Sequence, residues 1–185
     1  MTITKTIRKR RRENKTDYKL RMGLLKSEKP RIVIRKTNKY LIVQIVESYE
    51  AQDKVIMGVT SKDLLKSGWD KKFSGSLKSI PAAYFTGLLL AKKVGKGEFI
   101  VDVGMIRTVH GSRIFAVVKG LIDGGLKINA NKSAFPSDER LKGQHLKPEV
   151  KKMIEGMKIS AVVVETSKKE DKKEDKKVKE AKIKK

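Results

Sequence analysis

Alternating apolar and polar positions characterise the early part of the chain. Segments 31–37, 38–48 and 54–61 are rich in β-branched residues and alternate in part, which predicts three β-strands. Thr37 and Asn38 are the expected tight turn between the first two strands, since asparagine tolerates a positive φ better than most residues. Three consecutive strands with short connections indicate an antiparallel meander.

Helix-type spacing flanks these strands on both sides. Asn14 or Thr16 is the expected cap of a helix that runs to about Ser27, with several leucines on its apolar face. Ser61 is the expected cap of a short helix that Gly68 ends.

The second half of the chain predicts a helix over 82–94, a short apolar strand over 98–104 and an amphipathic helix over 113–124. Pro81 stands at the favoured first turn of the first of these helices. Together with the meander, these elements predict an α/β fold with a mixed, partly antiparallel sheet and packed helices.

The remaining segments are less regular. Residues 71–79 and 127–144 are expected to be loops, whereas 148–157 is expected to form one more short helix. Segment 159–164 is apolar and β-branched, so it is expected either to add a strand or to bind a partner.

Length and charge divide the chain into four parts. It has 185 residues, enough for one domain with appendages, and a net charge of +24. The expected parts are a basic N-terminal arm with its helix (1–29), the α/β core (30–130), a C-terminal extension (131–167) and a Lys/Glu/Asp-rich tail (168–185). Residues 1–36 alone hold 14 basic and 3 acidic side chains. Such a basic block indicates an RNA-binding arm.

Composition also excludes several classes of protein. The chain has no cysteine, which excludes disulfides, zinc ribbons and thiol catalysis. The longest apolar stretch is about a dozen residues, short of the roughly 20 that span a membrane. We therefore expect a cytoplasmic protein with no membrane partner, no metal and no cofactor.

Three groups of residues are candidates for contact with RNA. Guanidinium groups pair with phosphates and stack on unpaired bases, and tyrosine adds a stacking surface. The arm supplies the first group: Arg8, Lys9, Arg10, Arg11, Arg12, Lys15, Tyr18, Lys19 and Arg21. A nuclear-import signal or a merely solvated surface is the alternative for this group.

The second and third groups lie in connections. The tip of the first hairpin supplies Arg35, Lys36, Asn38, Lys39 and Tyr40, for which a plain polar turn is the alternative. The start of the 113–124 helix supplies His110, Gly111, Ser112 and Arg113, where backbone amides favour an anion and the glycine permits close approach.

Enzymatic signatures are weak by comparison. A metal-dependent nuclease would need Asp102 and His110 to act together, but a single strand carboxylate without companions favours a hydrogen-bonding role for Asp102. We therefore expect no catalytic residues and no enzymatic activity.

Several motifs then stand in order along residues 8–130. They are RRRENKTDY (10–18), KPRIVIRKTNKY (29–40), PAAYFTGLL (81–89), DVG (102–104) and GSRIFA (111–116). Together they resemble the large-subunit ribosomal proteins that bind 5S rRNA, family eighteen in its archaeal and eukaryotic branch.

The resemblance implies a mixed α/β sheet with packed helices and a structural role in the ribosomal central protuberance. There the family holds 5S rRNA through its arm and sheet-side surface and attaches it to 23S rRNA, beside neighbouring large-subunit proteins. The best-matched positions are Arg10 to Arg12, Lys15, Tyr18, Arg35, Asn38, Lys39 and Gly111 to Arg113. An RNA chaperone or a regulatory RNA-binding protein outside the ribosome is the alternative function.

Overall fold

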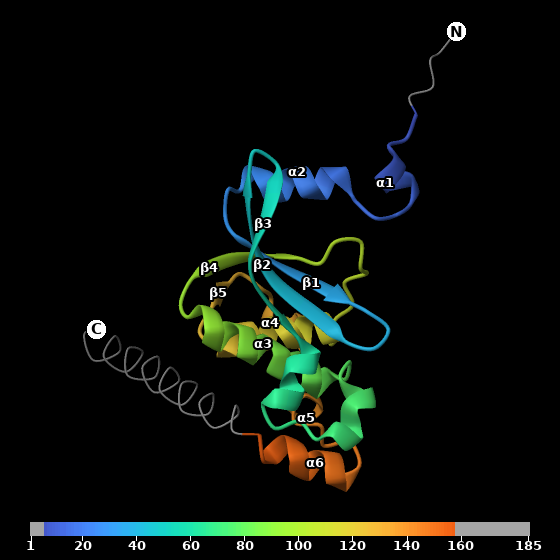
Figure 1. Cartoon of the computed structure of the whole chain (residues 1–185), viewed down its shortest axis with the longest axis vertical. Coiled ribbons are helices and arrows are strands. Elements are labelled where there is room, and N and C mark those ends of the chain that lie inside the picture. The colour runs from blue at the N-terminus through green and yellow to red at the C-terminus, as the bar shows by residue number, and fades with distance from the viewer. Residues whose placement is uncertain (1–5, 158–185) are drawn as a thin grey trace, which may run out of the picture.

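The computed structural model describes residues 6–157 (Figure 1). Its elements, in chain order, are α1 (Lys9–Arg12), α2 (Tyr18–Lys26), β1 (Arg31–Lys36), β2 (Leu41–Tyr49), β3 (Gln52–Thr60), η1 (Ser61–Lys66), η2 (Lys71–Ser76), α3 (Ile80–Val94), β4 (Glu98–Asp102), α4 (Arg113–Asp123), β5 (Lys127–Ile128), η3 (Lys132–Ala134), α5 (Asp138–Leu141) and α6 (Pro148–Glu155). The elements labelled η are 3-10 helices.

A five-stranded mixed sheet in the order β3-β2-β1-β4-β5 forms the centre of the molecule. β1 pairs antiparallel with β2, and β2 pairs antiparallel with β3. β4 instead pairs parallel with both β1 and β5. The predicted mixed, partly antiparallel sheet with packed helices is therefore confirmed.

Helices α3 and α4 cover one face of this sheet, here called the inner face (Figure 1). Because successive side chains of a strand point to opposite faces, Ile32 and Ile34 of β1 reach this core, as do Leu41, Val43 and Ile45 of β2. The two helices cross closely at Gly87 and Gly120, where a β carbon on either glycine would meet the backbone of the other helix.

A second apolar cluster lies at one end of α3. It contains Leu64 of η1, Trp69 from the connection between η1 and η2, and Phe85 of α3, together with Val150 and Ile154 of α6. Leu141 of α5 joins the main core. The described part of the C-terminal extension is therefore packed partly against the core under the sheet, through α5, and partly against the second cluster, through α6.

Strand positions follow the sequence prediction within a few residues, but the first turn differs. Thr37 and Tyr40 close it, through a hydrogen bond from the Thr37 amide to the Tyr40 carbonyl at 2.9 Å and one from the Tyr40 amide to Thr37 Oγ1 at 3.0 Å. The turn is therefore centred on residues 38–39, and Asn38 does not need a left-handed conformation. Non-glycine residues with positive φ lie elsewhere, at Asn14, Glu28, Glu50 and Ala51.

Both predicted caps in the N-terminal half were wrong. Asp17, rather than Asn14 or Thr16, caps α2, because its Oδ1 accepts from the amides of Lys19 and Leu20 at 2.9 and 3.4 Å. Its carboxylate stands where the orphan amides of the first turn can reach it.

Thr60, rather than Ser61, caps the short helix η1. Asp63 stands three residues later and completes a capping box with Thr60. Ser61 is buried instead, and its Oγ accepts from the amide of Leu41 at 3.1 Å.

Two segments expected to be loops contain regular structure. Segment 71–79 includes η2, and segment 127–144 includes β5, η3 and α5. Their apolar side chains are few, but Ile128 and Leu141 reach the core and order the chain around them. The short helix expected over 148–157 is confirmed as α6, while segment 159–164 and the 168–185 tail lie outside the described residues. Along residues 6–157, no helix is long and apolar enough to cross a membrane.

Candidate nucleic-acid interface

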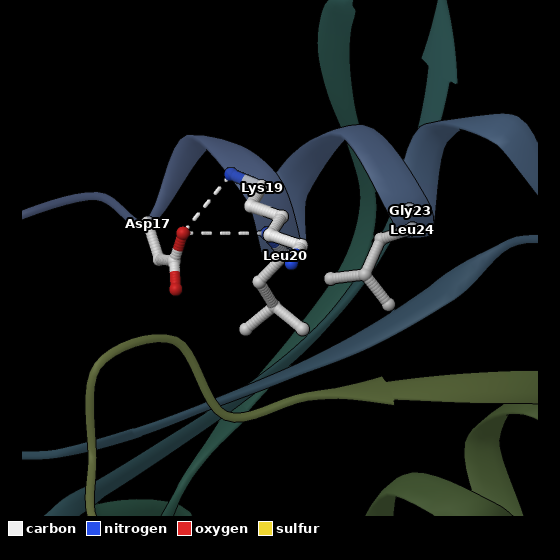
Figure 2. A pocket seen from close by; sticks show the side chains of 5 residues that line it. All are labelled: Asp17, Lys19, Leu20, Gly23 and Leu24. Carbon is white, nitrogen blue, oxygen red and sulfur yellow. Dashed lines mark hydrogen bonds between the residues drawn. The ribbon is translucent and has the colours of Figure 1, made fainter.

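Helix α2 lies over the outer face of the sheet, opposite α3 and α4 (Figure 1). Leu20 and Leu24 point from α2 toward the strands (Figure 2). They line one cleft with Val33 of β1, Val46 of β2 and Val55 of β3. Leu20 nevertheless keeps 43% of its surface exposed. The apolar contact under α2 is therefore incomplete.

A buried arginine lies in the sheet beside this cleft. Arg31 is only 2% exposed, and its Nη2 donates to Ser48 Oγ and to Asp53 Oδ1, both at 2.7 Å. Its Nη1 donates to Asp102 Oδ2 at 3.3 Å. A buried guanidinium requires such partners, because an unpaired charge in the interior costs several kcal/mol.

The second oxygen of Asp53 connects this pair to the N-terminal arm. Asp53 Oδ2 accepts from Arg21 Nη1 of α2 at 2.9 Å. Arg21 Nη2 donates to the carbonyl of Ala51, in the turn between β2 and β3, at 3.2 Å. Arg21 thus joins the arm to the sheet at two places, Asp53 of β3 and the turn that precedes β3.

Asp102 makes the corresponding connection on the other side of Arg31. Its Oδ1 accepts from Arg35 Nη2 at 3.3 Å and from the amide of Gly104 at 2.8 Å. Gly104 has a φ of 62°, and a β carbon there would lie 3.1 Å from the Arg35 guanidinium carbon. Arg21, Asp53, Arg31, Asp102 and Arg35 form one chain of alternating charges, here called the arginine–aspartate network.

The network affects the acidity of Asp53. Burial raises the pKa of Asp53, but hydrogen bonds from Arg21 and Ser48 and the positive charges of Arg31 and Arg21 outweigh that effect. The pKa of Asp53 therefore lies below its usual 3.8. The carboxylate is charged at neutral pH and holds both arginines.

Most candidate cations of the arm are exposed to solvent. They are Arg8, Lys9, Arg10, Arg11, Arg12, Lys15 and Lys19. Their internal contacts are few and exposed: Arg10 Nε donates to Thr16 Oγ1 at 2.9 Å, and Lys15 pairs with Glu13 at 2.8 Å. Exposed pairs of this kind contribute little to stability, so these cations remain available to phosphates.

Tyr18 is half-buried at the start of α2, and the Arg8 guanidinium lies 4.9 Å from its ring centroid. The stacking surface expected for a base is therefore already shared with an arginine of the same arm. Such a guanidinium and ring can both take part in stacking on an unpaired base.

The candidate RNA-contacting residues at the tip of the first hairpin differ in their exposure to solvent. Lys36, Asn38 and Lys39 are exposed, whereas Tyr40 is half-buried under Lys62, whose Nζ lies 4.4 Å from the ring centroid. Arg35 is held in the arginine–aspartate network instead of extending from the tip.

The start of α4 differs from a free anion site. Gly111 has a φ of 68°, as expected for a glycine at a close turn, but its amide donates to the carbonyl of Ala134 at 2.9 Å. Ser112 precedes the helix with its Oγ buried and without a hydrogen-bond partner among the described residues, and Arg113 is half-buried. Contact of these residues with RNA stays a prediction.

The nuclease hypothesis has little geometric support. Asp102 is 7% exposed and engaged by Arg31 and Arg35, while His110 is exposed and packs edge-on against Phe115 at 6.2 Å between ring centroids. The hydrogen-bonding role expected for Asp102 is confirmed. Within residues 6–157, no three acidic or histidine side chains gather into a group that could hold a metal ion.

Sequence reasoning placed Arg21 and Arg35 among the RNA-contacting residues but did not single out Arg31 or Asp53. Their pairing joins residues 22 positions apart, and that of Arg31 with Asp102 joins residues 71 apart. A basic residue inside an otherwise apolar strand was the one available signal for Arg31.

Comparison with known proteins adds an independent finding. The family model described as "Ribosomal large subunit proteins 60S L5, and 50S L18" matches residues 4–98 and 95–131. These ranges contain helices α1 to α4 and all five strands of the sheet.

Curated relatives agree with the family model. Large ribosomal subunit protein uL18 of Methanoregula boonei is 43% identical over 141 residues, covering 75% of this chain and 79% of that protein. The protein of the same name from Korarchaeum cryptofilum is 43% identical over 150 residues, covering 80% and 75%. That from Methanoculleus marisnigri is 45% identical over 141 residues, covering 75% and 78%.

Proposed function

The chain belongs to the family of large-subunit ribosomal proteins that comprises 60S L5 and 50S L18, and on that premise we propose that it binds 5S rRNA and attaches it to 23S rRNA in the central protuberance. The observation that carries the proposal is the exposed cationic set of the arm, Arg8 to Arg12 with Lys15 and Lys19, at one end of the molecule (Figure 1).

Charge gives the physical reason for an RNA partner. A net charge of +24 opposes close packing of copies of the free protein, whereas RNA phosphates neutralise it and release counterions. Phosphate contacts from the arm would fix the position of the protein, and Tyr18 with Arg8 offers a stacking surface to an unpaired base.

The role is structural in this proposal. The protein holds RNA segments in register through a rigid sheet, and it acts without turnover and without a cofactor. Lys36, Asn38 and Lys39, exposed at the tip of the hairpin between β1 and β2, supply further polar and cationic contacts. Neighbouring large-subunit proteins complete the set of proposed partners.

Isolation of the tagged full-length protein from cells tests the proposal. We expect it to sediment with large subunits through a moderate-salt wash, with 5S rRNA in the recovered RNA. Recovery of transfer or messenger RNA without 5S rRNA would favour the alternative, an RNA chaperone or regulator outside the ribosome. RNA cleavage by the purified protein with any divalent metal would contradict the structural role.

A further inference from the structure

The N-terminal arm is attached to the sheet mainly by charge. Leu20 and Leu24 provide the apolar contact of α2, and Leu20 keeps 43% of its surface exposed. Lys29 pairs with Glu98 at 2.7 Å at the end of the arm, but both side chains are about half exposed. Such an exposed pair contributes little. The pair of Arg21 and Asp53 is less exposed, at 33% and 34% of the side chains, and Arg21 adds a hydrogen bond to the Ala51 carbonyl, so this contact has the larger share in holding α2.

The orientation of the Asp53 carboxylate is set by residues other than Arg21. The carboxylate accepts from Arg31 at 2.7 Å with one oxygen and from Arg21 at 2.9 Å with the other. Arg31 itself is fixed by Asp102 and by Ser48, so it cannot turn away. Arg21 thus meets a carboxylate whose direction is set by a buried cation.

The turn between β2 and β3 supplies the second contact of Arg21. Glu50 and Ala51 both adopt positive φ, at 47° and 63°, which is unusual for residues other than glycine. This conformation holds the Ala51 carbonyl 3.2 Å from Arg21 Nη2. Both terminal nitrogens of Arg21 are therefore engaged, and a phosphate could approach them only in competition with these contacts.

We propose that Asp53 and Arg21 are positioning residues for RNA binding: they fix the exposed cations of α1 and α2 relative to the sheet and do not themselves contact RNA. This inference rests on the proposed function, since it assumes that the arm binds RNA. It assigns to an acidic residue a favourable effect on binding to a polyanion.

The first test measures the affinity of the full-length Asp53→Asn variant for 5S rRNA. The direction in which the affinity changes decides the result. Removal of a negative charge should by simple electrostatics strengthen RNA binding. Positioning predicts the opposite, a loss of about tenfold, if the arm is correctly placed in only about a tenth of the molecules. Glu47→Gln removes an exposed carboxylate from β2 and is the matched control, with unchanged or slightly tighter binding expected. Equal or tighter binding by Asp53→Asn would overturn the proposal.

Salt dependence gives the second test. Arg21→Gln leaves the pairing of Arg31 with both aspartates in place, so this variant should fold normally. We expect it to lower the affinity for 5S rRNA with an unchanged slope of log K against log salt. Lys19→Gln, on the same helix, should instead reduce the slope by roughly 0.7 to 0.9, because an exposed phosphate-contacting cation is lost. A comparable reduction in slope by Arg21→Gln would make it a phosphate contact and refute the proposal.

Hydrogen exchange of the RNA-free protein separates this inference from the proposed function. The amides of α2 should exchange faster in Arg21→Gln and in Asp53→Asn than in the wild type, and at the wild-type rate in Lys19→Gln. If the α2 amides exchange at the same rate in all four proteins, Arg21 and Asp53 do not hold α2 on the sheet, and this inference fails whatever RNA the protein binds. If it loosens as expected while 5S rRNA binding is absent in the wild type, only the proposed function fails.

Discussion

Gly87 of α3 and Gly120 of α4 lie where the two helix backbones touch. A β carbon on Gly87 would meet the carbonyl oxygen of Val117, and one on Gly120 would meet that of Tyr84. The two helices can therefore lie side by side on the inner face of the sheet (Figure 1). In the sequence both glycines stand inside helical patterns, where they reduce helix propensity, and the close approach explains their presence.

Replacement of Gly120 by alanine should destabilise the protein by about 1–3 kcal/mol, because the new methyl group must displace a helix backbone that cannot yield easily. Urea unfolding followed by circular dichroism measures the change. Gly23→Ala is the matched control: it lies in α2 with no atom within 4 Å of the added carbon, and it should be neutral or stabilising. Equal stability of Gly120→Ala and the wild type would show that α3 and α4 can separate freely.

In the turn between β2 and β3 we expect the reverse exchange, alanine to glycine, to stabilise the protein. Ala51 holds a φ of 63° without being glycine. Ala51→Gly should raise the free energy of unfolding by about 0.5–1 kcal/mol, since relief of the left-handed strain exceeds the added chain entropy. Ala51→Val should lower it, because a β-branched side chain is strongly disfavoured there. Thermal unfolding of both variants checks this prediction, and the same sign for both would refute it.

Stability in acid should depend on Asp63, the carboxylate of the η1 capping box. The hydrogen bond from the Thr60 amide lowers the pKa of Asp63 below its usual 3.8; burial opposes this, but the Thr60 hydroxyl, Lys93 and Lys66 act in the same direction as the amide. A lowered folded-state pKa means that the stabilisation is complete above 3.8 and is lost as the pH falls through the folded-state value.

Asp63→Asn should accordingly unfold more easily at pH 7, by about 1 kcal/mol, because the charged acceptor is replaced by a neutral one. The difference from the wild type should shrink as the pH falls from 3.8 through the lower folded-state pKa of Asp63, because the wild-type carboxylate is then protonated as well. Urea unfolding between pH 7 and pH 2 measures both curves. A difference that stays constant down to pH 2 would contradict the proposed role of the carboxylate.

The elements were predictable from the sequence because their signals are local. Alternation located β1 and β2, and helical spacing between Pro81 and Gly95 located α3. The capping residues were less predictable, since several neighbouring polar residues near each helix start could serve as the cap and only one of them does. Asp17 was selected over Thr16 by its contacts with backbone amides, which the pattern alone does not distinguish.

The candidate site was predictable only in part. Exposed cations such as Lys15 and Lys19 remain candidates because a basic block needs no tertiary partner to be recognised. Whether an arginine faces solvent or an internal carboxylate is decided by contacts between distant segments. Arg21 and Arg35 look like their neighbours in the sequence, yet both are held by aspartates far along the chain.

The exposed arginines of α1 should determine the salt dependence of RNA binding. Arg10, Arg11 and Arg12 are exposed and lie in a single short helix at the end of the molecule. Their simultaneous replacement by glutamine should weaken binding of 5S rRNA and reduce the slope of log K against log salt by about 2–3, as roughly 0.7–0.9 is lost per phosphate contact. Replacement of all three by lysine preserves the charge and should keep most of the slope while losing bidentate contacts. Titration of labelled 5S rRNA from 50 to 300 mM KCl measures both variants. An unchanged slope in the glutamine variant would show that these arginines do not contact RNA. The RNA contact would then have to lie at the hairpin tip around Lys36 and Lys39. Neutralisation of these two lysines would in that case reduce the slope in the same titration.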